Sequence, residues 1–111
     1  MDPRLPAHLE VSGILRRAHA EGGFATVLSR GERDAGTILV LTMERGGNAR
    51  LWERMPQLDG ARSFQVTMAE DIENPKKIHE YLARRTAQDP DSWIIELDID
   101  SADRFVASLP G

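Results

Sequence analysis

The sequence predicts an α+β protein in which two helices accompany a mostly antiparallel sheet of four or five strands. Apolar residues recur with the period of a helix in two segments and with the two-residue alternation of a strand in several others. These segments follow one another in the order α-β-β-β-β-α-β, and short glycine-containing connections join the early strands as hairpins. The length of 111 residues fits a single domain that spans residues 1–111.

Residues 9–21 are predicted to form the first helix, and a glycine pair ends it. Its apolar face is made by Val11, Ile14, Leu15 and Ala18. The opposite face carries the small residues Gly13 and Ala20, flanked by Arg16 and Arg17. This small-residue face either contains a tolerated glycine or allows another helix to approach closely.

Residues 36–44 contain the best-defined strand, and the rest of the sheet is expected to form around it. Its side chains are apolar on both faces, with Leu39, Leu41 and Met43 on one side and Ile38 and Val40 on the other. A strand of this kind lies in the middle of a sheet that is covered on both sides. We therefore expect residues 38–41 to be almost fully buried.

One strand is predicted before this segment, at residues 24–30, and one after it, at residues 49–55. The later strand carries charges on both faces, and Trp52 lies between Arg50 and Arg54. Charges on both faces are typical of an edge strand or of a strand at an interface. Arg50, Trp52 and Arg54 are therefore the candidate interface residues.

The remaining elements are a strand at residues 63–68, a helix at residues 74–88 and a last strand at residues 92–99. One helical turn is expected after them. The single apolar stripe on each helix favours both helices on one face of the sheet. The second apolar face of the central strand then needs another cover, either from this chain or from a second copy. Trp93 is expected on the helix side, against the end of the second helix near Leu82.

Three parts of the chain carry a family resemblance. They are residues 9–18, residues 23–25 with 34–40, and residues 81–85 followed by 89–96. The most specific is the run Asp89-Pro-Asp-Ser-Trp93. With these segments the chain resembles the small bacterial family called domain of unknown function 1491. The resemblance covers most of the chain except residues 101–111, and it implies a compact cytoplasmic α+β domain without a known activity.

The composition excludes several classes of function. The chain has no cysteine, so disulfides, thiolate metal sites and cysteine nucleophiles are impossible. Residues 1–7 lack the features of a signal peptide, and no apolar run approaches the roughly 20 residues that span a bilayer, which predicts a cytoplasmic protein. The net charge of −4 disfavours nonspecific binding to nucleic acid or to anionic membranes.

The sequence assigns no catalytic residue, metal or cofactor. His8, His19 and His79 lie on separate segments without the spacing of metal ligands. No serine stands in a nucleophile elbow, and no glycine pair has the lysine of a phosphate-binding loop.

Arg85 is the least expected residue, because it continues the apolar stripe of the second helix. A buried charge without a partner is too costly to keep. Arg85 therefore either extends past the helix end into solvent, pairs with a carboxylate, or binds an anion. Together with Arg16 and Arg17 it forms the set of candidate binding residues.

Three functions remain open at this point. The first is a non-enzymatic protein-protein interaction module or homodimer, whose partner is a second copy or another protein. Its partner surface is the strand at residues 49–55 or the small-residue face of the first helix. The second is a small anion- or metabolite-binding protein, or an enzyme, that uses Arg85 and neighbouring arginines. The third is nucleic-acid binding through the hairpin from Arg45 to Arg54.

Overall fold

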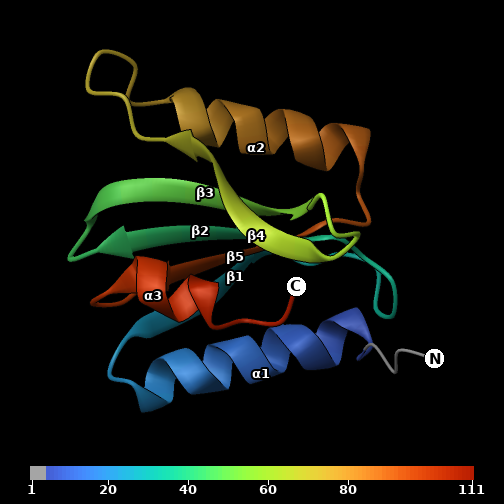
Figure 1. Cartoon of the computed structure of the whole chain (residues 1–111). Coiled ribbons are helices and arrows are strands. Elements are labelled where there is room, and N and C mark those ends of the chain that lie inside the picture. The colour runs from blue at the N-terminus through green and yellow to red at the C-terminus, as the bar shows by residue number, and fades with distance from the viewer. Residues whose placement is uncertain (1–4) are drawn as a thin grey trace.

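The computed structural model describes residues 5–111, and within them the chain forms three helices and a five-stranded sheet (Figure 1). The helices are α1 (Ala7–Ala20), α2 (Lys77–Gln88) and α3 (Ala102–Ala107). The strands are β1 (Phe24–Ser29), β2 (Ile38–Glu44), β3 (Gly47–Pro56), β4 (Arg62–Ala69) and β5 (Trp93–Asp98). Residues 1–4, part of the segment considered for a signal peptide, lie outside the described residues. No helix within residues 5–111 is long and apolar enough to cross a bilayer.

The strands lie in the order β1-β5-β2-β3-β4. The predicted α+β class is confirmed, although the sheet is mixed, because β2 and β5 run parallel while the other neighbouring strands are antiparallel. The helical turn expected near the C-terminus is the short helix α3, whose Phe105 and Val106 are buried.

The sheet is covered on both faces, with α1 and α3 on one side and α2 on the other (Figure 1). The prediction that both helices share one face is wrong, and the alternative that this chain covers the second face itself is correct. Strand β2 shows the reason. Ile38 and Val40 belong to the core under α1 and α3, whereas Leu39 and Leu41 belong to the core under α2. All four are at most 2% exposed, which confirms the predicted burial of the central strand.

Strand β3 is not an edge strand, because β2 and β4 pair with it on either side. The prediction of an edge strand at residues 49–55 is therefore wrong. The edges of the sheet are β1 and β4. The charges on both faces of β3 have partners on the helices and strands around it.

Trp93 is buried, as predicted, but it packs in the core under α1 and α3. The predicted neighbour Leu82 belongs to the other core, so this part of the prediction is wrong. The indole Nε1 of Trp93 donates a hydrogen bond to the backbone carbonyl of Glu32 at 2.7 Å. The guanidinium of Arg30 lies over the ring at 5.3 Å.

The two-sided burial of β2 gives the first testable prediction. Leu41→Ala should lower the free energy of unfolding by about 2–5 kcal/mol, because it removes buried apolar surface and leaves a cavity under α2. Denaturant unfolding followed by circular dichroism measures this loss. A loss below about 1 kcal/mol would contradict the position of Leu41 in the core.

Candidate functional site

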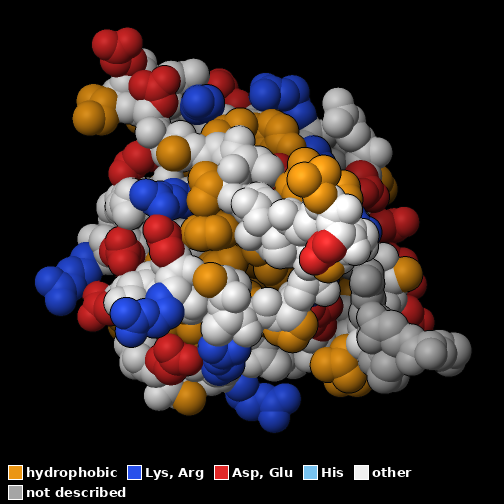
Figure 2. Space-filling model, viewed as in Figure 1, with side chains coloured by type: hydrophobic (Ala, Val, Ile, Leu, Met, Phe, Trp, Pro, Cys, Tyr) orange, Lys and Arg blue, Asp and Glu red, His pale blue; other side chains and the backbone are white. Residues whose placement is uncertain are grey.

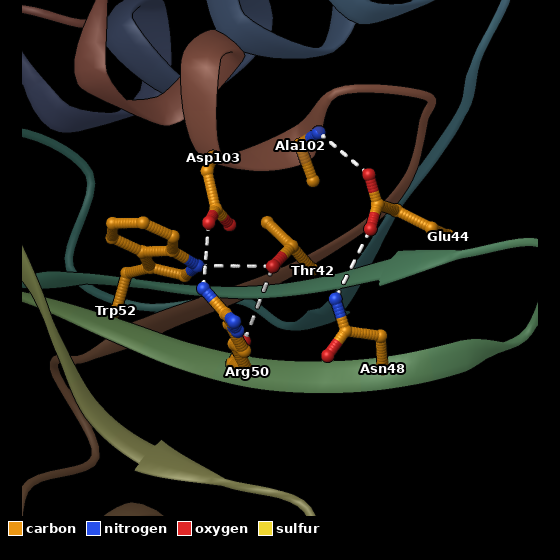
Figure 3. A network of polar contacts seen from close by, with 7 residues as sticks. All are labelled: Thr42, Glu44, Asn48, Arg50, Trp52, Ala102 and Asp103. Atoms are coloured by element: carbon orange, nitrogen blue, oxygen red, sulfur yellow. Dashed lines mark hydrogen bonds and ion pairs between the residues drawn. The ribbon is translucent and has the colours of Figure 1, made fainter.

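The three candidate interface residues of β3 all face the α1 and α3 side of the sheet. Trp52 is only 7% exposed, and its indole Nε1 donates a hydrogen bond to Thr42 Oγ1 at 2.9 Å (Figure 3). Arg50 Nη1 donates to Asp103 Oδ2 at 2.6 Å, which ties β3 to α3 (Figure 3). These contacts join β3 to β2 and α3 of the same chain.

The same network continues along the hairpin between β2 and β3 (Figure 3). Glu44 accepts a hydrogen bond from the side-chain amide of Asn48 at 3.1 Å and another from the backbone N–H of Ala102 at 3.3 Å. The hydrogen bond from Asn48, followed by that from Ala102, lowers the pKa of Glu44. Glu44 is therefore a carboxylate that joins the hairpin to the start of α3.

Arg54 forms the most buried ion pair on this face. Both of its terminal nitrogens donate to the carboxylate of Glu10 on α1, and the two side chains are only 11% and 13% exposed. Its guanidinium also lies over the Phe64 ring at 4.7 Å. The candidate interface residues Arg50, Trp52 and Arg54 thus all make side-chain contacts within the chain.

Arg85 pairs with a carboxylate, which is one of the three alternatives that the sequence left open. Arg85 Nη1 donates to Glu53 Oε1 and, at 2.8 Å, to the hydroxyl of Tyr81. Glu53 Oε2 in turn accepts from Thr67 at 2.7 Å and from Tyr81 at 3.0 Å. The carboxylate thus has a donor for each of its oxygens, and the cluster joins α2 to β3 and β4.

Burial and hydrogen bonds shift the pKa values of Glu53 and Arg85 in opposite directions, and the hydrogen bonds outweigh burial. Burial by itself raises the pKa of Glu53, but hydrogen bonds from Thr67, Arg85 and Tyr81, with the charge of Arg85, hold this pKa below its ordinary value of 4.5. Burial by itself lowers the pKa of Arg85, and the hydrogen bonds to Glu53 and Tyr81 outweigh it and raise this pKa. Both side chains are therefore charged at neutral pH.

The three candidate binding arginines do not meet in one site, because Arg85 lies on α2 and the other two on α1, across the sheet. Arg17 Nε lies 3.4 Å from the carboxylate of Glu21, and its guanidinium lies over the Phe105 ring at 4.8 Å. Arg16 is exposed. An added Cβ on Gly13 would meet nothing within 4 Å, so no described residue packs against α1 at this position.

The hairpin proposed for nucleic acid has its arginines next to carboxylates. Besides Arg50 and Arg54, Arg45 Nε lies 3.7 Å from Asp100. On the face of the molecule seen in Figure 2, basic and acidic side chains are interspersed. A stripe of positive charge along a groove, which binding to a nucleic-acid backbone requires, is not seen on this face.

Edge strand β1 is different, because large apolar side chains on it face solvent. Phe24 is 78% exposed and Leu28 is 46% exposed. Both lie on the α2 side of the sheet, where α2 covers the strands next to β1 but leaves β1 bare. An open groove of about 430 Å³ lies between β1 and α2. Leu28 and Ile94 line it on the sheet side, and Leu82 and Ala83 line it on the helix side. We call Phe24, Thr26 and Leu28 the β1 strip.

The β1 strip was not singled out from the sequence. Ala25 and Val27 point to the opposite face and pack against the core under α1 and α3. Residues 24–28 thus carry apolar side chains on both faces, as β2 does. This two-sided apolar pattern is visible in the sequence. It does not show, however, which of the two faces of β1 is left uncovered by α2.

The fold and these clusters define a small α+β protein in which ion pairs join the helices to β3 and in which the edge strand β1 is bare. The chain belongs to the DUF1491 family: the family model, described as "Protein of unknown function (DUF1491)", matches residues 5–107. The family resemblance seen in the sequence is therefore confirmed.

Solved structures of relatives have the same fold. A crystal structure of a DUF1491 family protein from Caulobacter crescentus CB15 is 30% identical, with a TM-score of 0.82 over 96% of this chain and 98% of that one. An NMR structure of a DUF1491 family protein from the same organism is 31% identical, with a TM-score of 0.77 over 96% and 94% of the two chains. The solution structure of protein Atu0922 from A. tumefaciens is 28% identical, with a TM-score of 0.75 over 97% of each chain. The comparison with curated proteins gives no match.

The Glu53–Arg85 cluster gives the second prediction. Arg85→Ala should lower the free energy of unfolding at neutral pH by about 1.5–3 kcal/mol, because it removes hydrogen bonds to a charged, half-buried carboxylate. The adjacent and exposed Arg84 provides the matched control, and Arg84→Ala should change stability by less than about 0.5 kcal/mol. Urea unfolding of the two variants and the wild type measures both changes.

The sign of the pH dependence follows from the lowered pKa of Glu53. A carboxylate whose pKa is lowered by folding contributes stability above its unfolded pKa, and this contribution disappears as the pH falls through the folded pKa. Wild type and Arg85→Ala should therefore differ most at neutral pH and converge in acid, below 4.5. Equal losses for Arg85→Ala and Arg84→Ala would contradict a structural role for the pair.

Proposed function

We propose that this protein is a non-enzymatic protein-protein interaction module that forms a homodimer through the surface of β1. The observation that carries the proposal is the β1 strip, where Phe24 lies exposed at the start of the strand and Leu28 lies exposed beside an uncovered groove. Exposed large apolar side chains on an unpaired sheet edge are typical of interaction sites. A cytoplasmic location and a single domain are part of the proposal, and the composition, with 29% charged residues and no cysteine, supports them.

The charged clusters support a non-enzymatic role. A general acid or base needs a proton that it can exchange near neutral pH, whereas hydrogen bonds keep Glu53 and Glu44 ionised there. An anion site needs an arginine that faces the ligand, whereas Arg85 and Arg54 each face a carboxylate of the same chain. These residues are better suited to holding the helices on the sheet than to binding a substrate.

The size of the exposed strip sets the strength of self-association that we expect. Burying one Phe or Leu side chain completely is worth about 1.5–3 kcal/mol, so the two copies together gain at most about 6–12 kcal/mol from Phe24 and Leu28. Association costs about 4–15 kcal/mol in lost freedom of motion. The apolar contacts alone thus only offset this cost. A dimer at tens of micromolar needs further contacts that contribute about 6–7 kcal/mol, and it should dissociate on dilution.

Size-exclusion chromatography with light scattering tests the proposal. At tens of micromolar the mass should be about twice the 12.4 kDa of one chain, and it should fall toward 12.4 kDa on dilution. The double variant Phe24→Lys with Leu28→Lys should remain monomeric at the same concentration, because two ammonium groups cannot be buried in the contact without partners.

Ile72→Lys is the matched control, since Ile72 is 94% exposed in the loop before α2 and lies outside the β1 strip. This variant should dimerise like the wild type. A strict monomer for the wild type at tens of micromolar would refute the proposal. A dimer that tolerates both lysines in β1 would move the interface to another surface.

A further inference from the structure

We infer that the second copy joins this chain edge to edge, so that β1 pairs with β1 of the second copy in an antiparallel register centred on Thr26. The inference rests on the proposed self-association and specifies how it occurs. The occupant of the free edge is a second copy of this chain, because the edge is complementary to itself in hydrogen bonding, in side-chain pattern and in charge.

Backbone hydrogen bonds show which residues of β5 direct their N–H and C=O groups toward β2. Trp93 donates its N–H to the carbonyl of Thr37 at 2.6 Å, and Ile99 donates its N–H to the carbonyl of Met43 at 3.0 Å. Both bonds point toward β2 and the segment that leads into it. Successive residues of a strand direct their backbone groups to opposite sides, so the odd-numbered residues of β5 face β2 and the even-numbered ones face β1.

The register between β5 and β1 then fixes the free edge. Phe24 lies opposite Asp98, and Thr26 lies opposite Glu96. Phe24 and Thr26 therefore exchange backbone hydrogen bonds with β5, while Ala25 and Val27 direct their N–H and C=O groups to the outside. Within residues 5–111, no backbone hydrogen bond beyond the sheet reaches these two residues. Unpaired groups of this kind are a template for another strand.

A two-fold axis at Thr26 satisfies these outward groups completely. Ala25 then lies opposite Val27 of the second copy, and the two residues exchange both of their backbone hydrogen bonds, once on each side of the axis. Thr26 lies opposite Thr26 of the second copy in a non-hydrogen-bonded pair, where the side chains are closest. The contact is isologous, because both copies use the same edge of β1. Neither copy therefore has a free β1 edge once two chains have paired.

The same register matches the side chains of the β1 strip. Phe24 of one copy lies opposite Leu28 of the other, and the reverse pair lies beyond the axis. Each exposed apolar side chain thus gains an apolar neighbour on the α2 side of the joined sheet. The pairing with β5 shifts its register between Val27 and Ser29, so Leu28 is the last residue that this register can pair, and the contact is limited to residues 24–28.

The charges at the two ends of β1 favour the antiparallel direction. Glu21, Asp98 and Asp100 surround the start of the strand, where Arg45 is already paired with Asp100 at 3.7 Å. Arg30 follows the end of the strand and is exposed. Antiparallel pairing brings Arg30 of each copy beside the acidic end of the other, and the joined sheet contains the five strands of each copy in one layer.

A cysteine cross-link tests this register, because the chain has no cysteine of its own. A non-hydrogen-bonded antiparallel pair has its Cα atoms about 4.5 Å apart, which a disulfide can span. Thr26 is exposed, so Thr26→Cys should leave the fold intact. Under mild oxidation this variant should form a covalent dimer at least about tenfold faster than the control, because the two thiols are held together at high effective concentration.

Gln65→Cys is the matched control, since Gln65 is exposed on β4, the other edge strand. Reduction of cross-linked Thr26→Cys should restore the monomer–dimer equilibrium of the wild type, which shows that the variant is folded. If the wild type dimerises but Thr26→Cys cross-links no faster than Gln65→Cys, the edge-to-edge pairing is wrong and the proposed self-association stands. If the wild type is a monomer, the proposed function fails and this inference fails with it.

Discussion

The parallel pairing of β2 with β5 is the contact on which the rest of the structure depends. It joins a hairpin strand to the last strand of the chain, and residues from Ile38 to Met43 lie opposite residues from Trp93 to Asp98. Both strands have apolar side chains on both faces, so each face needs a cover of its own. The helices α1 and α3 supply one cover and α2 supplies the other, which gives a layer of helices on each side of one sheet.

Two neighbouring residues of β3 hold α1 and α2 on the two faces of the sheet. Glu53 points to one face and holds Arg85 of α2, whereas Arg54 points to the other face and holds Glu10 of α1. Removing one partner of such a half-buried pair leaves the other charge without its ionic partner, which costs more than the pair contributes when intact. The charged residues of β3 therefore fix both helices on the sheet. The free edges of the sheet are β1 and β4, and β1 is the edge on which Phe24 and Leu28 lie exposed.

Several parts of this arrangement could be predicted from the sequence, and the reasons for the errors are physical. The periodicity of residues 38–41 identifies the central strand because two-sided burial leaves a local signature. The position of β3 could not be read in this way, because the partners of its charges lie far away along the chain, at Glu10, Arg85 and Asp103. An edge strand and an inner strand with long-range ion pairs have the same local pattern. The pairing of Arg85 was among the stated alternatives, whereas Phe24 and Leu28 were not identified, since their exposure depends on where α2 lies.

Amide hydrogen exchange along β1 tests most directly the claim that this edge is free in one chain and paired between two. The amides of Phe24 and Thr26 should be protected at all protein concentrations, because they donate hydrogen bonds to β5. The amides of Ala25 and Val27 should be protected at high concentration and should exchange quickly after dilution to the monomer. Rapid exchange of the Ala25 and Val27 amides at every concentration, in a sample that remains dimeric, would contradict the pairing of β1 between two chains.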